Sequence, residues 1–178
     1  MLSVALNMPA SADGVGNKAA LCVSCHGENG LPSDPQIPII AGQEFYYLYV
    51  QLKDYKAGRR ANPIMQGIVA GLSKEEMQAL AQHFADKPWP ATGYQAPDTV
   101  AKVANPGLVA GQCVQCHLGG YEGNSRVPRL AGQQVAYLTH TMQQFKRKAR
   151  LNSPAKNSLL KEYEAETIAA MAEYLGGL

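Results

Sequence analysis

Apolar residues recur every three or four positions in six segments of the chain, and no segment alternates convincingly between apolar and polar residues. This period is typical of amphipathic helices, so the sequence predicts an all-α protein. The predicted helices span residues 14–25, 43–57, 73–85, 104–116, 133–148 and 164–175. Ser73 and Glu76 form the Ser-x-x-Glu pattern of a capping box, which marks the start of the third helix.

The second half of the chain repeats the first. Pro38-Ile-Ile-Ala-Gly-Gln43 recurs as Pro128-Arg-Leu-Ala-Gly-Gln133 and Tyr47-Leu48 as Tyr137-Leu138, each 90 positions later, and Ala81-Gln-His-Phe84 corresponds to Ala172-Glu-Tyr-Leu175 at an offset of 91. Similarity at an offset of 90 or 91 along the whole chain predicts two tandem copies of one helical domain.

A proline-rich segment separates the two copies. Residues 87–97 contain three prolines and one glycine, which forbid a continuous helix. We therefore expect a first domain at 1–88, a semi-rigid linker at 89–98 and a second domain at 99–178.

Composition and charge narrow the classes of protein. The chain is 46% hydrophobic and 17% charged, as expected for a globular core, and no apolar run approaches the 18 or so residues of a membrane span. A net charge of +2 speaks against nucleic-acid binding. The dense basic cluster at 146–150 is either a helix end that complements the helix dipole or a docking patch for an acidic redox partner. Peripheral contact with a membrane stays open.

All four cysteines belong to two Cys-x-x-Cys-His motifs, Cys22-Val-Ser-Cys25-His26 and Cys113-Val-Gln-Cys116-His117. In such a motif the two thiols add to the vinyl groups of a haem and the histidine binds the iron on its proximal side. The sequence therefore predicts two covalently bound haem c groups and redox chemistry.

A Cys-x-x-Cys pair can also be half of a zinc site or a thioredoxin-like redox pair. Neither alternative requires the histidine that directly follows both pairs. A Cys₄ zinc site would also have to join segments 91 positions apart.

Covalent attachment of this kind occurs outside the bacterial cytoplasm, so the haem motifs predict a mature periplasmic protein. Residues 1–10 lack a basic region and are too short to be a complete signal peptide. We expect them to be the remnant of a longer leader or an artefact.

An electron-transfer haem needs a second axial ligand. Met65 lies 39 positions after His26, in a predicted loop before the last helix of the first copy, and is the expected ligand of the first iron, with core packing as the alternative. Lys156 lies 39 positions after His117 in the corresponding loop, which contains no methionine.

Three arrangements are open for the second iron. Lys156 can bind as a neutral amine, since metal binding releases its proton. Met142 or His140 can bind instead, or the iron is open or water-bound and Lys156 is a solvated surface residue. An open iron would suit a redox enzyme acting on peroxide or sulfur compounds. We favour electron transfer, because no acid or base cluster accompanies the site.

Methionine raises the potential of a haem, whereas an amine is a harder donor that favours ferric iron. With Met65 and Lys156 as ligands, the second haem should have the lower potential. Electrons should then run from the C-terminal domain to the N-terminal one.

Together these motifs resemble the dihaem cytochromes c of the cytochrome c4 type, a tandem of class I cytochrome c domains. The resemblance rests on the two haem motifs, the Pro-x-x-Ala-Gly-Gln segments and Asn62-Pro-Ile-Met65, and it covers nearly the whole chain. It implies small α-helical cytochrome c domains, haems close to the domain interface, and a periplasmic electron shuttle. It also implies that the carbonyls of Pro38 and Pro128 orient His26 and His117.

The chain departs from the family at Lys156, where methionine would be expected. In this respect it is similar to a specialised member, such as the c4-like electron-accepting partner of thiosulfate dehydrogenase. The resemblance implies protein redox partners, with a dehydrogenase as donor and a terminal oxidase or another protein as acceptor.

Overall fold

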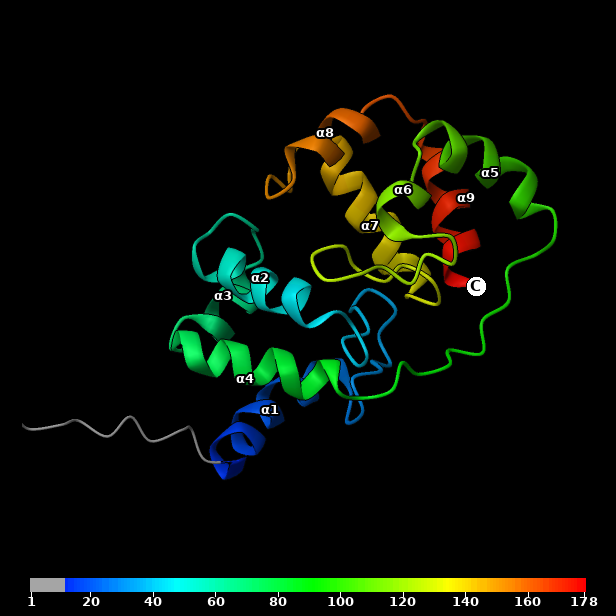
Figure 1. Cartoon of the computed structure of the whole chain (residues 1–178). Coiled ribbons are helices and arrows are strands. Elements are labelled where there is room, and N and C mark those ends of the chain that lie inside the picture. The colour runs from blue at the N-terminus through cyan, green and yellow to red at the C-terminus, as the bar shows by residue number, and fades with distance from the viewer. Residues whose placement is uncertain (1–11) are drawn as a thin grey trace, which may run out of the picture.

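The computed structural model describes residues 12–178, and over this range the chain folds into nine helices without a β-sheet, which confirms the all-α prediction (Figure 1). The helices are α1 (Ala12–His26), α2 (Phe45–Lys56), α3 (Pro63–Val69), α4 (Lys74–Ala85), α5 (Val100–Ala110), α6 (Val114–His117), α7 (Val135–Lys146), α8 (Pro154–Leu160) and α9 (Ala165–Gly176). None of these helices is both long and apolar enough to cross a bilayer. The predicted leader remnant lies outside the described residues.

The helices form two units, each with its own apolar core (Figure 1). In the first unit, helices α1 to α4 enclose a cluster that includes Val69, Leu80 and Phe84. In the second, helices α5 to α9 enclose Leu138, Ile168 and other buried residues. The two cores do not merge, as the internal repeat predicts, and an extended segment joins α4 to α5.

The helix predicted at 104–116 is wrong in its bounds. Helix α5 begins four residues earlier, ends at Ala110, and the chain resumes as the short α6 at Val114. Gln112 between them adopts a left-handed conformation with φ of 50°, which an α-helix cannot contain. The break brings Gly111 close to the second core, since an added Cβ there would lie 2.8 Å from the Tyr163 hydroxyl.

Two short helices were not predicted, because seven residues are too few to show a helical period. Helix α3 begins at Pro63 after Asn62, whose side-chain oxygen accepts a hydrogen bond of 2.9 Å from the backbone N–H of Met65. Helix α8 also begins at a proline, Pro154, but Ser153 before it makes no side-chain capping bond. A capping residue followed by proline is a known signal for a helix start. Met65 and Lys156 therefore lie in helices rather than in the predicted loops.

The capping box at the start of α4 is present. Glu76 N–H donates to Ser73 Oγ over 3.2 Å, and Ser73 N–H donates to Glu76 Oε2 over 2.8 Å. In the second unit Glu164 precedes α9 and makes no such side-chain bond. The repeat therefore preserves the helix but not its cap.

The Pro-x-x-Ala-Gly-Gln segments hold the two units together. The Gln43 amide accepts a hydrogen bond of 2.8 Å from Arg129 N–H and donates one of 3.0 Å to Arg129 O. Gln133 pairs with the backbone of Ile39 in the same way, over 2.8 and 3.0 Å. Ile39 and Arg129 are equivalent in the repeat, as are Gln43 and Gln133. Each unit therefore contributes one glutamine that bonds the backbone of the other, and the contacts are related by a pseudo-twofold axis.

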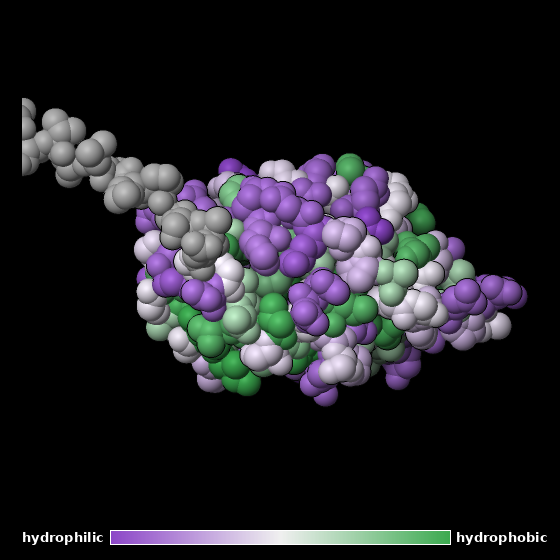
Figure 2. Space-filling model, turned by 90° about the horizontal axis from the view of Figure 1, so that it is seen from below, coloured by the Kyte–Doolittle hydropathy of each residue, from purple (hydrophilic) through white to green (hydrophobic). Residues whose placement is uncertain are grey.

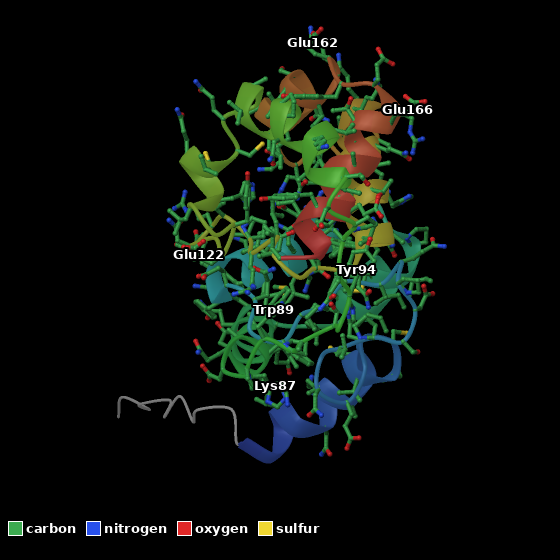
Figure 3. All side chains as sticks on the ribbon, turned by 90° about the vertical axis from the view of Figure 1, so that its right-hand side faces the viewer. Lys87, Trp89, Tyr94, Glu122, Glu162 and Glu166 are labelled. Carbon is green, nitrogen blue, oxygen red and sulfur yellow. The ribbon has the colours of Figure 1, made fainter. Side chains whose placement is uncertain are left out.

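Trp89 covers the junction from the linker (Figure 3). A Cβ on Gly42 would lie 2.6 Å from the backbone nitrogen of Trp89, and one on Gly132 would lie 3.0 Å from its indole nitrogen. The guanidinium of Arg129 lies 4.9 Å from the centre of the indole ring. The repeated glycine thus lets the linker pass close to both copies.

This close approach predicts that Gly42→Ala destabilises the protein more than Gly93→Ala. Both glycines have positive φ, of 62° and 71°, so both alanines carry the same backbone strain of about 1 kcal/mol. Only the Cβ at position 42 collides with backbone, which adds on the order of 1–3 kcal/mol, since Gly93 has no atom within 4 Å. Chemical unfolding of both variants measures the difference, and equal losses would contradict the contact with Trp89.

Candidate functional site

A cavity of about 590 Å³ extends through both units and across their junction. Nine of the ten residues predicted to bind haem line it from both sides, and Cys116 is the exception. The nine are Cys22, Cys25, His26, Pro38, Met65, Cys113, His117, Pro128 and Lys156. The structure therefore brings the two sets of residues into one connected space rather than into two closed pockets.

His26 and His117, which both line this cavity, are held alike in the two units. Each Nδ1 lies 2.9 Å from a carbonyl oxygen, that of Pro38 for His26 and that of Pro128 for His117. A carbonyl only accepts hydrogen bonds, so Nδ1 carries the proton and Nε2 keeps its lone pair. The lone pair is what a metal ion requires.

Burial keeps both imidazoles neutral. The two side chains are almost fully buried, which disfavours the charged form and lowers the pKa of His26. Burial lowers the pKa of His117 to about 4, and the positive charge of Lys156 adds to this effect, as that of Arg60 does for His26. Both histidines are therefore in the protonation state of a ligand over the neutral pH range.

The cysteines precede these histidines on the same helical turns. Cys22 and Cys25 lie in the last turns of α1, and Cys113 and Cys116 flank the start of α6. Cys22 and Cys113 are partly buried, Cys25 and Cys116 are exposed, and none of the four is in a disulfide. No group of three or more His, Cys, Asp or Glu in the described range could hold a bare metal ion, so the two pairs do not assemble a Cys₄ site.

Met65 and Lys156 occupy the same place in their units, the third residue of α3 and of α8. Met65 packs against the first core. Burial lowers the pKa of Lys156, and the charge of Arg150 lowers it further, whereas Cys116 and Cys113 raise it. Lys156 lines the same cavity as Cys113 and His117.

The alternatives Met142 and His140 both lie on α7 and line the cavity. Met142 packs against the second core, and His140 is exposed at the cavity edge. Neither occupies the position that Met65 has in the first unit.

Sequence reasoning missed two buried arginines. Arg60 and Arg150 line the cavity with 7% and 5% of their surface exposed, and in the described range neither lies within ion-pair distance of a carboxylate. A buried cation without a counter-ion is costly. Haem c carries two carboxylates, so these residues fit the predicted cofactor. The two arginines are 90 positions apart, which is the offset of the repeat in this region, and this match could have identified them as equivalent residues of the two units.

The basic cluster at 146–150 is largely structural. Lys146 Nζ donates to the backbone oxygen of Tyr163, and Arg150 is buried at the junction. Lys56 makes the corresponding bond to Leu72 in the first unit. Of its four basic side chains only those of Arg147 and Lys148 are exposed, so the cluster is mainly a helix end.

Two exposed apolar side chains at the cavity edge of the first unit have no large apolar counterpart in the second unit. Leu21 and Ile64 line the cavity and are 58% and 71% exposed. Gln112 and Ala155 occupy the corresponding positions of the second unit. Figure 2 shows that the face of the molecule seen there carries separate hydrophobic patches among hydrophilic ones. The two units therefore offer different surfaces to a partner.

Comparisons with known proteins agree with this geometry, although no model of a protein family matches the chain. The chain is 31% identical to cytochrome c4 of Pseudomonas aeruginosa, over 90% of its own length and 85% of the relative's. It is 33% identical to a thiosulfate dehydrogenase electron acceptor of Stutzerimonas stutzeri, over 93% and 82% of the two lengths. Reduced recombinant cytochrome c4 from Pseudomonas stutzeri superposes with a TM-score of 0.85 at 27% identity, covering 95% of this chain and 99% of that one. The chain therefore belongs to the cytochrome c4 family, as an electron-transfer protein rather than an enzyme, with two covalent haem c groups and with proteins as redox partners.

Proposed function

We propose that the protein is a directional relay in which the two irons have different axial ligands. Cys22 and Cys25 attach the first haem and Cys113 and Cys116 the second. His26 and Met65 bind the first iron, and His117 and Lys156 bind the second. The observation that carries this proposal is the shared position of Met65 and Lys156, third in a proline-initiated helix that lines the cavity.

When bound, each haem supplies a one-electron change at its iron. The chain supplies what tunes that change. The Pro38 and Pro128 carbonyls hold the imidazole rings in one orientation and make their free nitrogens stronger donors. The thioether of Met65 favours the ferrous state, and the amine of Lys156 favours the ferric state. With these ligands, electrons would pass from the haem held by the C-terminal domain to the haem held by the N-terminal one.

Spectroscopy of the oxidised protein tests the ligand assignment. Near-infrared and electron paramagnetic spectra distinguish methionine from amine ligation, so we expect one signature of each kind. Two identical methionine signatures would exclude Lys156. Rapid binding of carbon monoxide to one reduced haem would instead favour an open iron, as the enzyme alternative requires.

We also propose a dehydrogenase of the thiosulfate-oxidising type as the electron donor and a terminal oxidase or another protein as the acceptor, in the bacterial periplasm. Support comes from the 33% identity to a thiosulfate dehydrogenase electron acceptor. Mixing the oxidised protein with thiosulfate dehydrogenase and thiosulfate should reduce both haems. Reduction no faster than with thiosulfate alone would contradict this donor.

The domain bounds follow from the same arrangement. We propose one haem in each of the domains 1–88 and 99–178, with 89–98 as the linker. Support comes from the separate cores and from the lack of helix between Ala85 and Val100.

A further inference from the structure

The cavity wall where the two units meet is polar and buried. Arg60 and Arg150, equivalent in the repeat, approach each other there from the two units. Tyr47 and Tyr137, also equivalent, lie with them, and Arg60 donates to the Tyr137 hydroxyl over 3.0 Å. Each arginine also lies 4.6 Å from the ring that precedes it, Tyr55 or Phe145. The wall thus presents two positive charges to the cavity.

A single oxygen atom joins these two cations. Gln51 Oε1 accepts 3.0 Å from Arg60 Nη1 and 2.9 Å from Arg150 Nη2, and Asn152 Nδ2 donates to it over 3.1 Å. Because both guanidiniums share one acceptor, they are held side by side in spite of their repulsion. Three donors saturate this oxygen, which fixes the position of the Gln51 side chain.

The position equivalent to Gln51 in the second unit does not bridge the two arginines. Thr141 stands where the second copy would have its glutamine, and its buried hydroxyl makes no hydrogen bond to either arginine. Asn152, which donates to Gln51, also donates a hydrogen bond of 2.8 Å to the carboxylate of Asp54. Asp54 itself forms an ion pair of 2.8 Å with Arg59 and with neither of the two buried arginines. The bridge between the two arginines therefore depends on one residue of the first unit.

The chemistry of this residue matters as much as its position. An amide oxygen accepts the arginine hydrogen bonds without cancelling their charge, whereas a carboxylate would cancel part of it. The remaining positive charge is available for the carboxylates of both haems.

We propose that Gln51 is a positioning residue that joins Arg60 and Arg150 into one cationic site shared by both haems. Each haem then responds to both arginines, and a change in this site alters the potential of the haem in the other unit. This goes beyond the relay proposed above, because it holds whichever residue is the sixth ligand of the second iron.

The test is a redox titration of dihaem variants in which each haem is followed by its own ferric haem-methyl resonances. In Gln51→Glu the acceptor stays and a negative charge is added, so the ferrous-to-ferric ratio at a fixed solution potential should fall on the order of fivefold at both haems. Arg150→Gln removes a cation and should also lower the ratio at both haems. Arg150→Lys keeps the charge and should restore most of it.

Thr141→Val is the matched control, since it changes the equivalent position without touching an arginine, and both ratios should stay as in the wild type. Circular dichroism checks that each variant is folded. If Gln51→Glu does not fold, the two Arg150 variants decide. A shift confined to the haem of the mutated unit, or equal shifts in Arg150→Gln and Arg150→Lys, would overturn the shared site.

Discussion

Lys156→Met is expected to raise the potential of the second haem by on the order of 100 mV, a modest part of the roughly 0.8 V range that axial ligands cover. A thioether stabilises ferrous iron, whereas the amine it replaces stabilises ferric iron. Position 156 is the third residue of α8, as Met65 is of α3, so the new side chain starts from the matching place. Spectroelectrochemical titration should show that the potential of the second haem rises towards that of the first, so that the difference between them becomes smaller.

Lys161→Met provides the control for loss of a positive charge. Its side chain is 57% exposed and pairs with Glu162 over 3.1 Å, at the end of the same segment. This variant should leave both potentials and both ferric spectra unchanged. If Lys156→Met changed neither the potential nor the near-infrared spectrum of the second haem, Lys156 would not be its ligand.

Short sequence patterns correctly predicted the helical fold and the cofactor. The Cys-x-x-Cys-His motifs, the internal repeat and the capping box at Ser73 are short segments whose residues act on near neighbours, and the fold and the cofactor follow from them. Helices of seven residues, such as α3 and α8, are too short to show a helical pattern of apolar residues, although Asn62-Pro63 and Ser153-Pro154 signal their starts.

The wall between the haem sites could not be predicted in this way. Gln51, Arg60 and Arg150 meet only because the two units dock, and their separations along the chain are as large as 99 positions. A single sequence shows three ordinary polar residues at these places. The role of the two arginines becomes visible only in the folded chain, where they are buried without a carboxylate partner.

The docked Pro-x-x-Ala-Gly-Gln segments also connect the two haem sites. The Pro38 carbonyl orients His26, and the next residue, Ile39, receives both hydrogen bonds of Gln133 from the other unit. The same holds for Pro128, Arg129 and Gln43. Each proximal histidine is thus braced by the opposite unit, so the dihaem arrangement is a property of the pair of domains.

Met65→Lys is expected to lower the potential of the first haem by on the order of 100 mV, since it gives that iron the harder ligand. Combined with Lys156→Met, it should reverse the order of the two potentials and so the direction of the relay. Rapid-mixing kinetics would then find the first haem reduced before internal transfer to the second, and spectra of the ferric double variant should again show one methionine and one amine signature.

Ile64→Lys separates ligation from charge in this experiment. Ile64 precedes Met65, is 71% exposed and lines the cavity edge, so a lysine there adds the same charge without replacing the thioether. A nearby cation favours the ferrous state and should leave the potential unchanged or slightly higher. The two adjacent lysines should therefore act in opposite directions. A fall in potential with Ile64→Lys, or a rise with Met65→Lys, would contradict Met65 as the ligand that sets the potential of the first haem.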